Sequence, residues 1–456
     1  MKVTKSLSEG NIYKSLFLYA LPLLFSSILS QAYSTVDAII AGKFISEFAL
    51  GAISATSSFE TLLVAIFGGF AGGFSVYVAQ LFGRGDHAVI KRDVVQMAAL
   101  VAGATILVST LAILFRDPLF DYLKVDPILR DDAERYFILC TSGYVLTFVN
   151  SLLVQCLHAL GITSFSLYVS ISSAILNIGG NLLSVVVFDL GVAGLALSTI
   201  LSTAVATVFY VVLLRRAFRE LDGRVSLRFS LSGIRYSFRY TVPASAQQVA
   251  FHGVTLLIAP VINGLGAAAT TGYTVSHRFY VIASMSLWAM TSAFACYTAQ
   301  CVGERSYGKI RKGLAVGFLL NAVMMLPFVL VLMIFARPLA SMFFPSDYVA
   351  EAYEYAVRYA TVFLPFLYVQ LVGHILHSYM RCLGRVTLVL VISLFGSVIR
   401  YAFVLLLTPE IGMDGIFLSQ ILGWVGDMIL STILYLTLYR TPEQIRRTVE
   451  KLPRED

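Results

Sequence analysis

Twelve long apolar segments constrain this 456-residue chain more than any other feature of its sequence. Each is about 20 residues or longer, the length that an α-helix needs to cross the hydrocarbon core of a bilayer. They are 15–41, 48–82, 91–115, 133–157, 163–188, 192–214, 237–261, 268–301, 311–336, 351–380, 386–408 and 413–438. Transmembrane β-strands would instead show about ten residues of alternating hydrophobicity. The sequence therefore predicts an all-α polytopic membrane protein with twelve transmembrane helices.

The composition excludes several other classes of protein. Hydrophobic residues make up 58% of the chain and charged residues 13%, whereas soluble domains carry about 25% charged residues. An ordinary soluble enzyme, a disordered chain and a disulfide scaffold are excluded, and a nucleic-acid partner is not expected despite a net charge of +7. No HExxH motif, Walker motif or nucleophile–base set is present. We therefore expect a monomer without enzymatic activity or cofactor.

The distribution of Lys and Arg predicts the orientation of the chain in the membrane. If both termini are cytoplasmic, 24 of the 33 Lys and Arg residues lie in inner segments and 7 in outer loops. Positive residues accumulate on the cytoplasmic side of membrane proteins. We therefore expect a multi-pass protein of the cytoplasmic membrane, with lipid around it and both termini inside.

An internal repeat divides the chain into two halves of six spans. The segment 77–92 aligns with 297–312 at an offset of 220, and 190–201 aligns with 411–422 at 221. Six spans are an even number, so both halves enter the membrane in the same direction. Such repeats, related by a pseudo-twofold axis along the membrane normal, occur in transporters whose bundles rock around a central site. The predicted parts are a cytoplasmic segment 1–14, an N-lobe 15–214, a basic cytoplasmic linker 215–236, a C-lobe 237–438 and a cytoplasmic tail 439–456.

Charged side chains inside spans are rare and mark functional sites by default. Asp37 is the strongest candidate for a functional site among these charged side chains. Ser30, Tyr33 and Ser34 precede it at helical spacing and form a polar stripe with it. It lies about 9 Å along the helix from Lys43, which favours the outer half of the membrane. We expect Asp37 to bind H⁺ or Na⁺; the alternative is a structural Asp that bonds a neighbouring helix.

Neutral oxygen carriers accompany this carboxylate in the fifth and sixth spans. Asn177 and Asn181 are four residues apart and share a helix face, and Thr199 lies in the next span. Hard cations prefer oxygen ligands, so Asp37 and these three residues make a plausible cation site. Without the carboxylate, the two Asn residues would be read as interhelical hydrogen-bonding groups.

Further polar side chains within the spans are expected to line a substrate cavity. They are Tyr33, Ser34, Glu60, Gln248, His252, His277, Arg278, Gln370, His374 and Arg400. The alternatives are counter-ion or snorkelling roles for the two Arg residues, and for Asp427 a structural partner such as Arg400. His374 and His377 suggest a metal site only weakly, since no carboxylate or thiolate is fixed beside them in the sequence.

Two further features concern the shape and packing of helices. Pro22 and Pro243 occupy equivalent positions in the two halves, and we expect each to kink its helix. The segment 66–74 contains two overlapping GxxxG pairs, Gly68/Gly72 and Gly69/Gly73. Such pairs allow close helix packing, and nothing around them has the strand-then-helix context of a phosphate-binding loop.

The chain resembles the multidrug and toxic compound extrusion (MATE) family from about residue 12 to 440. The segments that carry the resemblance include ALPLLFSSILSQAYSTVDAIIAGKF in the first span, LNIGGN in the fifth, LGVAGLALST in the sixth and IGMDGIFLSQILGW near the end. The resemblance implies antiport of amphipathic, cationic compounds against H⁺ or Na⁺. It also implies a cation site to which Asp37, Asn177 and Thr199 correspond, whereas an Asp is usual in place of Asn181.

The resemblance leaves two questions open. Other members carry acidic residues in the seventh and tenth spans, where this chain has Gln247, Gln248 and Gln370, so coupling through carboxylates of the C-lobe is not expected. The alternative function is a flippase for a lipid-linked oligosaccharide or peptidoglycan precursor. Such a pyrophosphate cargo would demand several cationic side chains in the cavity, and only Arg278 and Arg400 lie within spans.

Overall fold

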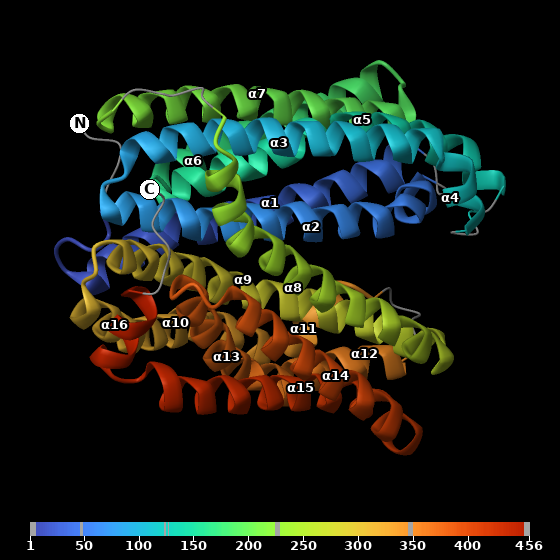
Figure 1. Cartoon of the computed structure of the whole chain (residues 1–456). Helices are drawn as coiled ribbons and strands as arrows, with labels where there is room; N and C mark the ends of the chain where they lie inside the picture. Colours follow the sequence, from blue (N-terminus) through green and yellow to red (C-terminus); the bar gives the residue numbers. More distant parts are fainter. Residues whose placement is uncertain are drawn as a thin grey trace. The chain divides into compact units, whose positions relative to one another are not determined.

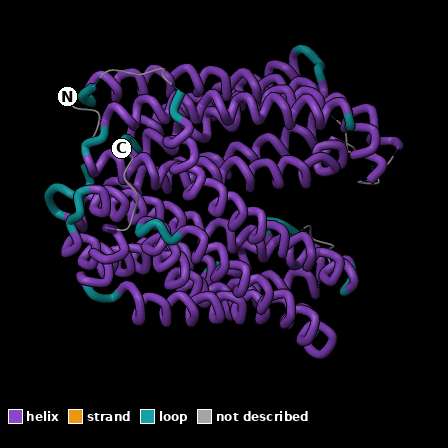
Figure 2. Tube along the Cα trace, viewed as in Figure 1, coloured by secondary structure: helices purple, strands orange, loops and turns teal. Residues whose placement is uncertain are grey.

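The computed structural model describes residues 6–45, 49–122, 125, 127–223, 229–344 and 350–450. Within these residues the chain is helical and contains no strand (Figure 2). The helices of the first half are α1 (Ile12–Phe44), α2 (Ala49–Arg84), α3 (His87–Leu114), α4 (Arg116–Tyr122), α5 (Pro127–Ala159), α6 (Ser164–Leu182), the π-helix η1 (Leu183–Val187) and α7 (Gly191–Glu220).

The second half follows the same plan. Its elements are α8 (Leu231–Gly264), α9 (Ala267–Gly303), α10 (Tyr307–Ile334), α11 (Ala336–Ser341), α12 (Ala350–Arg358), η2 (Tyr359–Phe363), η3 (Leu364–Phe366), α13 (Leu367–Cys382), α14 (Val386–Ile411), α15 (Met413–Leu434), η4 (Tyr435–Tyr439) and α16 (Pro442–Glu450). Twelve segments of the described chain are long and apolar enough to cross a membrane. They coincide with the twelve predicted spans to within a few residues, apart from the second, which begins at Phe59.

The backbone repeats itself at the offset that the sequence predicts. Helices α3 and α10 begin at His87 and Tyr307 and are both 28 residues long, and each is followed by one short helix. The turns before the fifth and eleventh spans also correspond: Gly161 has φ 82° and Gly384 has φ 77°. Glycine adopts this left-handed conformation without steric cost, so both halves turn in the same way.

The chain folds into two compact units that do not coincide with the two halves of the sequence. Unit 1 contains Phe25–Ser245, and unit 2 contains Leu7–Leu24 together with Ala246–Asp456. The long helices α1 and α8 therefore each contribute to both units. In both helices the change of unit falls two residues after the proline, at Leu24 for Pro22 and at Ser245 for Pro243.

In unit 1, α5 packs against α2, α3 and α7, and α6 packs against α7 (Figure 1). In unit 2, α9 packs against α10, α12 and α13, and α15 packs against α13 and α14. Helix α7 extends to Glu220 and α8 begins at Leu231, so both ends of the expected linker 215–236 are helical.

One of the two GxxxG pairs forms a close helix contact. A Cβ at Gly69 would lie 2.6 Å from the Cα of Ser245, and a Cβ at Gly73 would lie 2.8 Å from the Cα of Thr241. Gly68 has no such neighbour within 4 Å. The pair Gly69/Gly73 therefore lets α2 approach the first half of α8 within unit 1, which confirms the packing role predicted for this segment.

Candidate cation site

Four polar side chains of unit 1 form one hydrogen-bonded chain across three helices. Asn181 Nδ2 on α6 donates to Asp37 Oδ1 on α1 over 2.5 Å and also lies 3.2 Å from Asn177 Oδ1. Asn177 Nδ2 in turn donates to Thr199 Oγ1 on α7 over 3.2 Å. All four residues proposed from the sequence as a cation site are thus brought together.

Apolar packing holds the end of α1 against η1 and α7. Ile40 and Ala41, one turn beyond Asp37, are buried against Val185 of η1 and Leu195 of α7. The acidic side chain therefore projects from a helix whose neighbouring turn is anchored in a hydrophobic cluster. An anchored helix holds a functional side chain more precisely than a loop does.

Small residues bring α6 and α7 close enough for the Asn177–Thr199 contact. A Cβ at Gly180 would lie 3.1 Å from Ser198, and one at Gly194 would lie 2.9 Å from Ser184 Oγ. The two serine hydroxyls lie 3.1 Å apart. Directly after Asn181, α6 widens into the π-helix η1, and π-helical turns occur frequently at functional sites.

The electrostatics of the cluster depend on a single carboxylate. Asp37 is half-buried, whereas Asn177 and Asn181 are buried. Within the described part of the chain, no basic side chain forms an ion pair with Asp37, and the buried Asn181 Oδ1 has no hydrogen-bond partner. A rotation of the Asn181 amide would bring its carbonyl oxygen to the Asp37 carboxylate, and the two oxygens would then suit a small cation or a proton.

The other residues predicted in the first half lie outside this cluster of contacts. Tyr33 is half-buried, and Ser34 is exposed and donates its hydroxyl to the Ser30 carbonyl oxygen at 3.0 Å. Glu60 is exposed near the start of the second span. That these side chains line a substrate cavity stays a prediction.

In unit 2, two of the predicted cavity residues contact each other. Gln370 is buried on α13, its Nε2 donates to the Tyr280 hydroxyl at 2.9 Å, and it lies 3.4 Å from His374 Nε2. Gln248 is exposed and His252 is half-buried beside the ring of Phe251. A cavity-lining role for these residues is also untested.

The basic residues predicted in the second half separate into two environments. Arg278 is exposed and lies over the ring of Phe343, which follows α11, with 5.7 Å between guanidinium carbon and ring centroid. Arg400 is buried on α14 and its Nε has no hydrogen-bond partner. Arg400, His252 and Arg278 all interact electrostatically with His277, so two guanidinium groups act on one imidazole in this part of unit 2.

The sequence showed no carboxylate beside the two neighbouring histidines, but the fold brings one there: Asp427 Oδ1 is 3.1 Å from His377 Nε2. The partner of Asp427 in this pair is His377 and not Arg400. No group of three His, Cys, Asp or Glu side chains that could hold a metal occurs among the residues that the structure describes.

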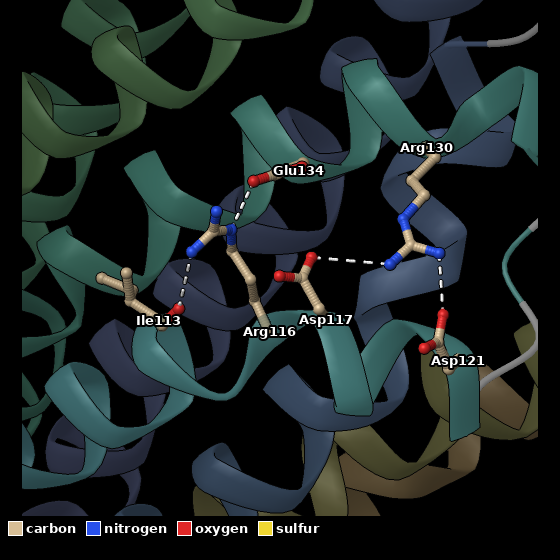
Figure 3. A network of polar contacts seen from close by, with 6 residues as sticks. All are labelled: Ile113, Arg116, Asp117, Asp121, Arg130 and Glu134. Atoms are coloured by element: carbon tan, nitrogen blue, oxygen red, sulfur yellow. Dashed lines mark hydrogen bonds and ion pairs between the residues drawn. The ribbon is translucent and has the colours of Figure 1, made fainter.

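A second polar cluster lies at one end of unit 1 (Figure 3). Arg130 contacts Asp121 at 2.7 Å and Asp117 at 3.5 Å, while Arg116 pairs with Glu134. The Glu134 carboxylate raises the pKa of the Arg116 guanidinium. Together these pairs tie the short helix α4 to the start of α5, and sequence reasoning missed α4 because it is too short to be a span.

The fold and this site define a class: polytopic helical membrane proteins built from two copies of one six-span plan. The family model MatE matches the chain twice, over residues 22–183 and 243–406. The two matches begin at Pro22 and Pro243, 221 residues apart, which agrees with the repeat. The chain therefore belongs to the MATE family of transporters.

Individual relatives extend over nearly the whole chain. The probable multidrug resistance protein YpnP of Bacillus subtilis (strain 168) is 24% identical over 414 residues, which cover 90% of this chain and 91% of the relative. A solved outward-facing MATE family transporter of the MOP superfamily has a TM-score of 0.88 at 19% identity and covers 99% of both chains.

A second solved structure has the same fold, but a different function is suggested for it. It is a MOP superfamily transporter from Pyrococcus furiosus, for which reversed polarity of the binding pocket suggests a different function. Its TM-score is 0.87 at 18% identity, and it covers 100% of both chains. At this identity the likeness shows the shared fold alone.

Proposed function

We propose that this protein is a secondary active antiporter that exports amphipathic, cationic organic compounds in exchange for an entering cation. The family and the name of the Bacillus subtilis relative support efflux of several compounds. The proposal places the protein in the cytoplasmic membrane as a monomer, with both termini inside and no cofactor.

One observation carries the proposal: the carboxylate of Asp37, which lies within the first span, is held by Asn181 in a cluster of neutral oxygens, and no basic side chain among the described residues pairs with it. A fixed basic partner would neutralise the carboxylate permanently. Without one, the negative charge in apolar surroundings is costly, so the site gains from binding a mobile positive charge. Either the coupling cation or a cationic substrate satisfies it, and competition between them couples their movements.

The geometry favours H⁺ over Na⁺ as the coupling ion. The nearest polar group to Asp37 is an amide N–H donor of Asn181 and not a second carboxylate. Na⁺ would have to replace its water ligands with several oxygens and only one negative charge. Protonation requires only that the Asn181 amide turn over, so that Oδ1 accepts the new O–H of Asp37.

In the proposed cycle the site faces the two sides of the membrane in turn. Asp37 takes up a proton from outside while the organic cation leaves, and it loses that proton to the cytoplasm before the next cation binds. A pH difference of one unit supplies about 1.4 kcal/mol for each proton that enters. A potential of about 100 mV supplies about 2.3 kcal/mol for each net charge that moves inward.

The test is accumulation of ethidium by proteoliposomes with imposed pH or Na⁺ gradients, comparing the native chain with Asp37→Asn. We expect gradient-driven accumulation by the native chain and only the background of protein-free vesicles for the variant. A suitable matched control is Asp189→Asn, because Asp189 is exposed in the turn after η1. Asn tolerates its left-handed backbone (φ 52°) as well as Asp does.

Two results would refute different parts of the proposal. Accumulation that is unchanged in Asp37→Asn would refute the coupling role of Asp37. The absence of ethidium transport by the native chain under every gradient would contradict export of organic cations.

A flippase for a lipid-linked pyrophosphate is the second candidate, and one observation favours it. Arg278 and Arg400 both interact electrostatically with His277, and two guanidinium groups in one part of unit 2 suit an anionic head group. Its test is translocation of a fluorescent lipid pyrophosphate in the same vesicles. Translocation that Arg400→Gln abolishes and Asp37→Asn leaves intact would replace the antiporter proposal.

A further inference from the structure

The second half of the chain contains a buried acid–histidine pair that the proposed cycle does not use. His377 on α13 and Asp427 on α15 approach to 3.1 Å, and their side chains are 8% and 16% exposed. His377 Nε2 and Asp427 Oδ1 do not meet in hydrogen-bond geometry. The two side chains therefore lie at ion-pair distance without an aligned hydrogen bond, and they attract each other as charges when His377 carries a proton on both ring nitrogens.

The surrounding helices leave room for the carboxylate. A Cβ at Gly373 on α13 would lie 2.5 Å from Asp427 Oδ2, and a Cβ at Gly396 on α14 would lie 3.1 Å from Asp427 Cβ. Two glycines on two different helices thus open the space that Asp427 fills. The position of the acid is specified by three helices and does not result from a loose surface contact.

Other titratable and charged groups face the pair from every helix around it. His374 and Arg381 lie on α13 and interact electrostatically with one another. Arg400 of α14 packs its Cβ against Gly423, one turn before the acid. On α9, the Tyr280 hydroxyl accepts a hydrogen bond from the side chain of Gln370, which lies on α13.

An aromatic pair stands next to the same acid. Trp424 lies three residues before Asp427 on α15, and its ring is stacked on that of Tyr280 with 6.0 Å between centroids. Aromatic faces attract organic cations, and a carboxylate one turn away adds a negative charge. Arg400 also acts electrostatically on Tyr280, so the attraction of this region for a positively charged organic molecule has to come from the Asp427 carboxylate.

We propose that His377 and Asp427 form a second proton-binding site, which releases its proton when an organic cation binds and regains one after the cation leaves. This inference rests on the proposed function. With one shared proton the pair carries no net charge. Loss of that proton leaves one negative charge, which the single positive charge of the cation balances.

The proposal predicts that transport uses one proton more per organic cation than Asp37 alone can supply. The proton moves between the pair and water, and no bond other than N–H or O–H changes. Because two interacting groups share the proton, it belongs to the pair and not to either residue.

The first test needs no substrate. The chain has six histidines, and His377→Gln identifies the imidazole signal of His377 in the nitrogen NMR spectrum of the full chain in nanodiscs. We expect this signal to change with pH and its titration curve to change when Asp427 is replaced in Asp427→Asn. His87, which lies 3.7 Å from the exposed Asp222, is the internal reference and keeps its curve. A His377 signal that Asp427→Asn leaves unaltered would overturn the proposal.

The second test measures the number of protons per ethidium from the gradient at which net transport stops. We expect His377→Gln to lower this number by about one relative to the native chain, because one site of the pair is removed, and His87→Gln to leave it unchanged. An unchanged number in His377→Gln contradicts the proposal. Failure of the native chain to move ethidium refutes the proposed function instead, and the NMR titration still decides whether the pair binds a proton.

Discussion

The close approach of two helix backbones in unit 1 predicts that two adjacent glycines, Gly68 and Gly69, respond differently to substitution. A Cβ at Gly69 would meet the Cα of Ser245 at 2.6 Å and the carbonyl oxygen of Ala244 at 2.8 Å. Both neighbours are backbone atoms, which cannot rotate away, so Gly69→Ala must separate α2 from α8. Such overpacking costs about 1–3 kcal/mol, and we expect the upper part of that range.

Gly68→Ala is the matched control, because nothing lies within 4 Å of its Cβ position. Ala is a better helix former than Gly by about 1 kcal/mol, so this variant should be as stable as the native chain or slightly more stable. The two variants should therefore differ by about 3 kcal/mol, which corresponds to about 3 °C in the temperature of unfolding for a chain of 456 residues.

A thiol-reactive dye measures this difference during heating, because Cys156 and three other cysteines are buried and react only when the protein opens. The native chain, Gly68→Ala and Gly69→Ala are heated in the same detergent and at the same rate. Equal unfolding temperatures for the two variants would refute the argument that this contact requires glycine.

Three further changes test other contacts. Tyr77→Phe removes the 2.6 Å hydrogen bond from its hydroxyl to the buried Asp93 and should lower stability by about 1–3 kcal/mol in the same dye assay; an unfolding temperature equal to that of the native chain would contradict this. Arg116→Gln breaks a pair near the membrane surface and should leave the unfolding temperature unchanged, so a large decrease would show that α4 depends on it. Asn181→Asp places a second carboxylate beside Asp37 and should make ethidium accumulation respond to Na⁺ as well as pH. Transport by Asn181→Asp that stays insensitive to Na⁺ would argue against the proposed reason for H⁺ selectivity.

Hydropathy predicted the twelve spans because a bilayer demands a long apolar helix at every crossing. The same criterion could not find α4 or α11, which are seven and six residues long. The π-helix η1 was also not predicted, because an inserted residue in a helix leaves no periodic signal in so short a segment. Both GxxxG pairs were visible in the sequence, but which pair packs depends on the rotation of α2 relative to its neighbour.

The candidate cation site was predicted residue by residue, because polar groups in apolar spans are few and the resemblance to a family indicated which of them belong together. The sequence could not show how the amide of Asn181 is oriented: its N–H points at Asp37, and its oxygen has no hydrogen-bond partner. The pair of His377 and Asp427 was missed because 50 residues separate them and only the packing of α13 against α15 brings them into contact.

The assignment of residues 7–24 to the unit that otherwise begins at Ala246 has a consequence for synthesis. The ribosome must add the 221 residues from Phe25 to Ser245 before it begins the rest of the unit to which this segment belongs. At about 5–20 residues per second, that interval lasts about 10–40 s. During this time the start of α1 lacks the rest of its own unit, so lipid or an insertion factor has to shelter it while the rest of the chain is translated.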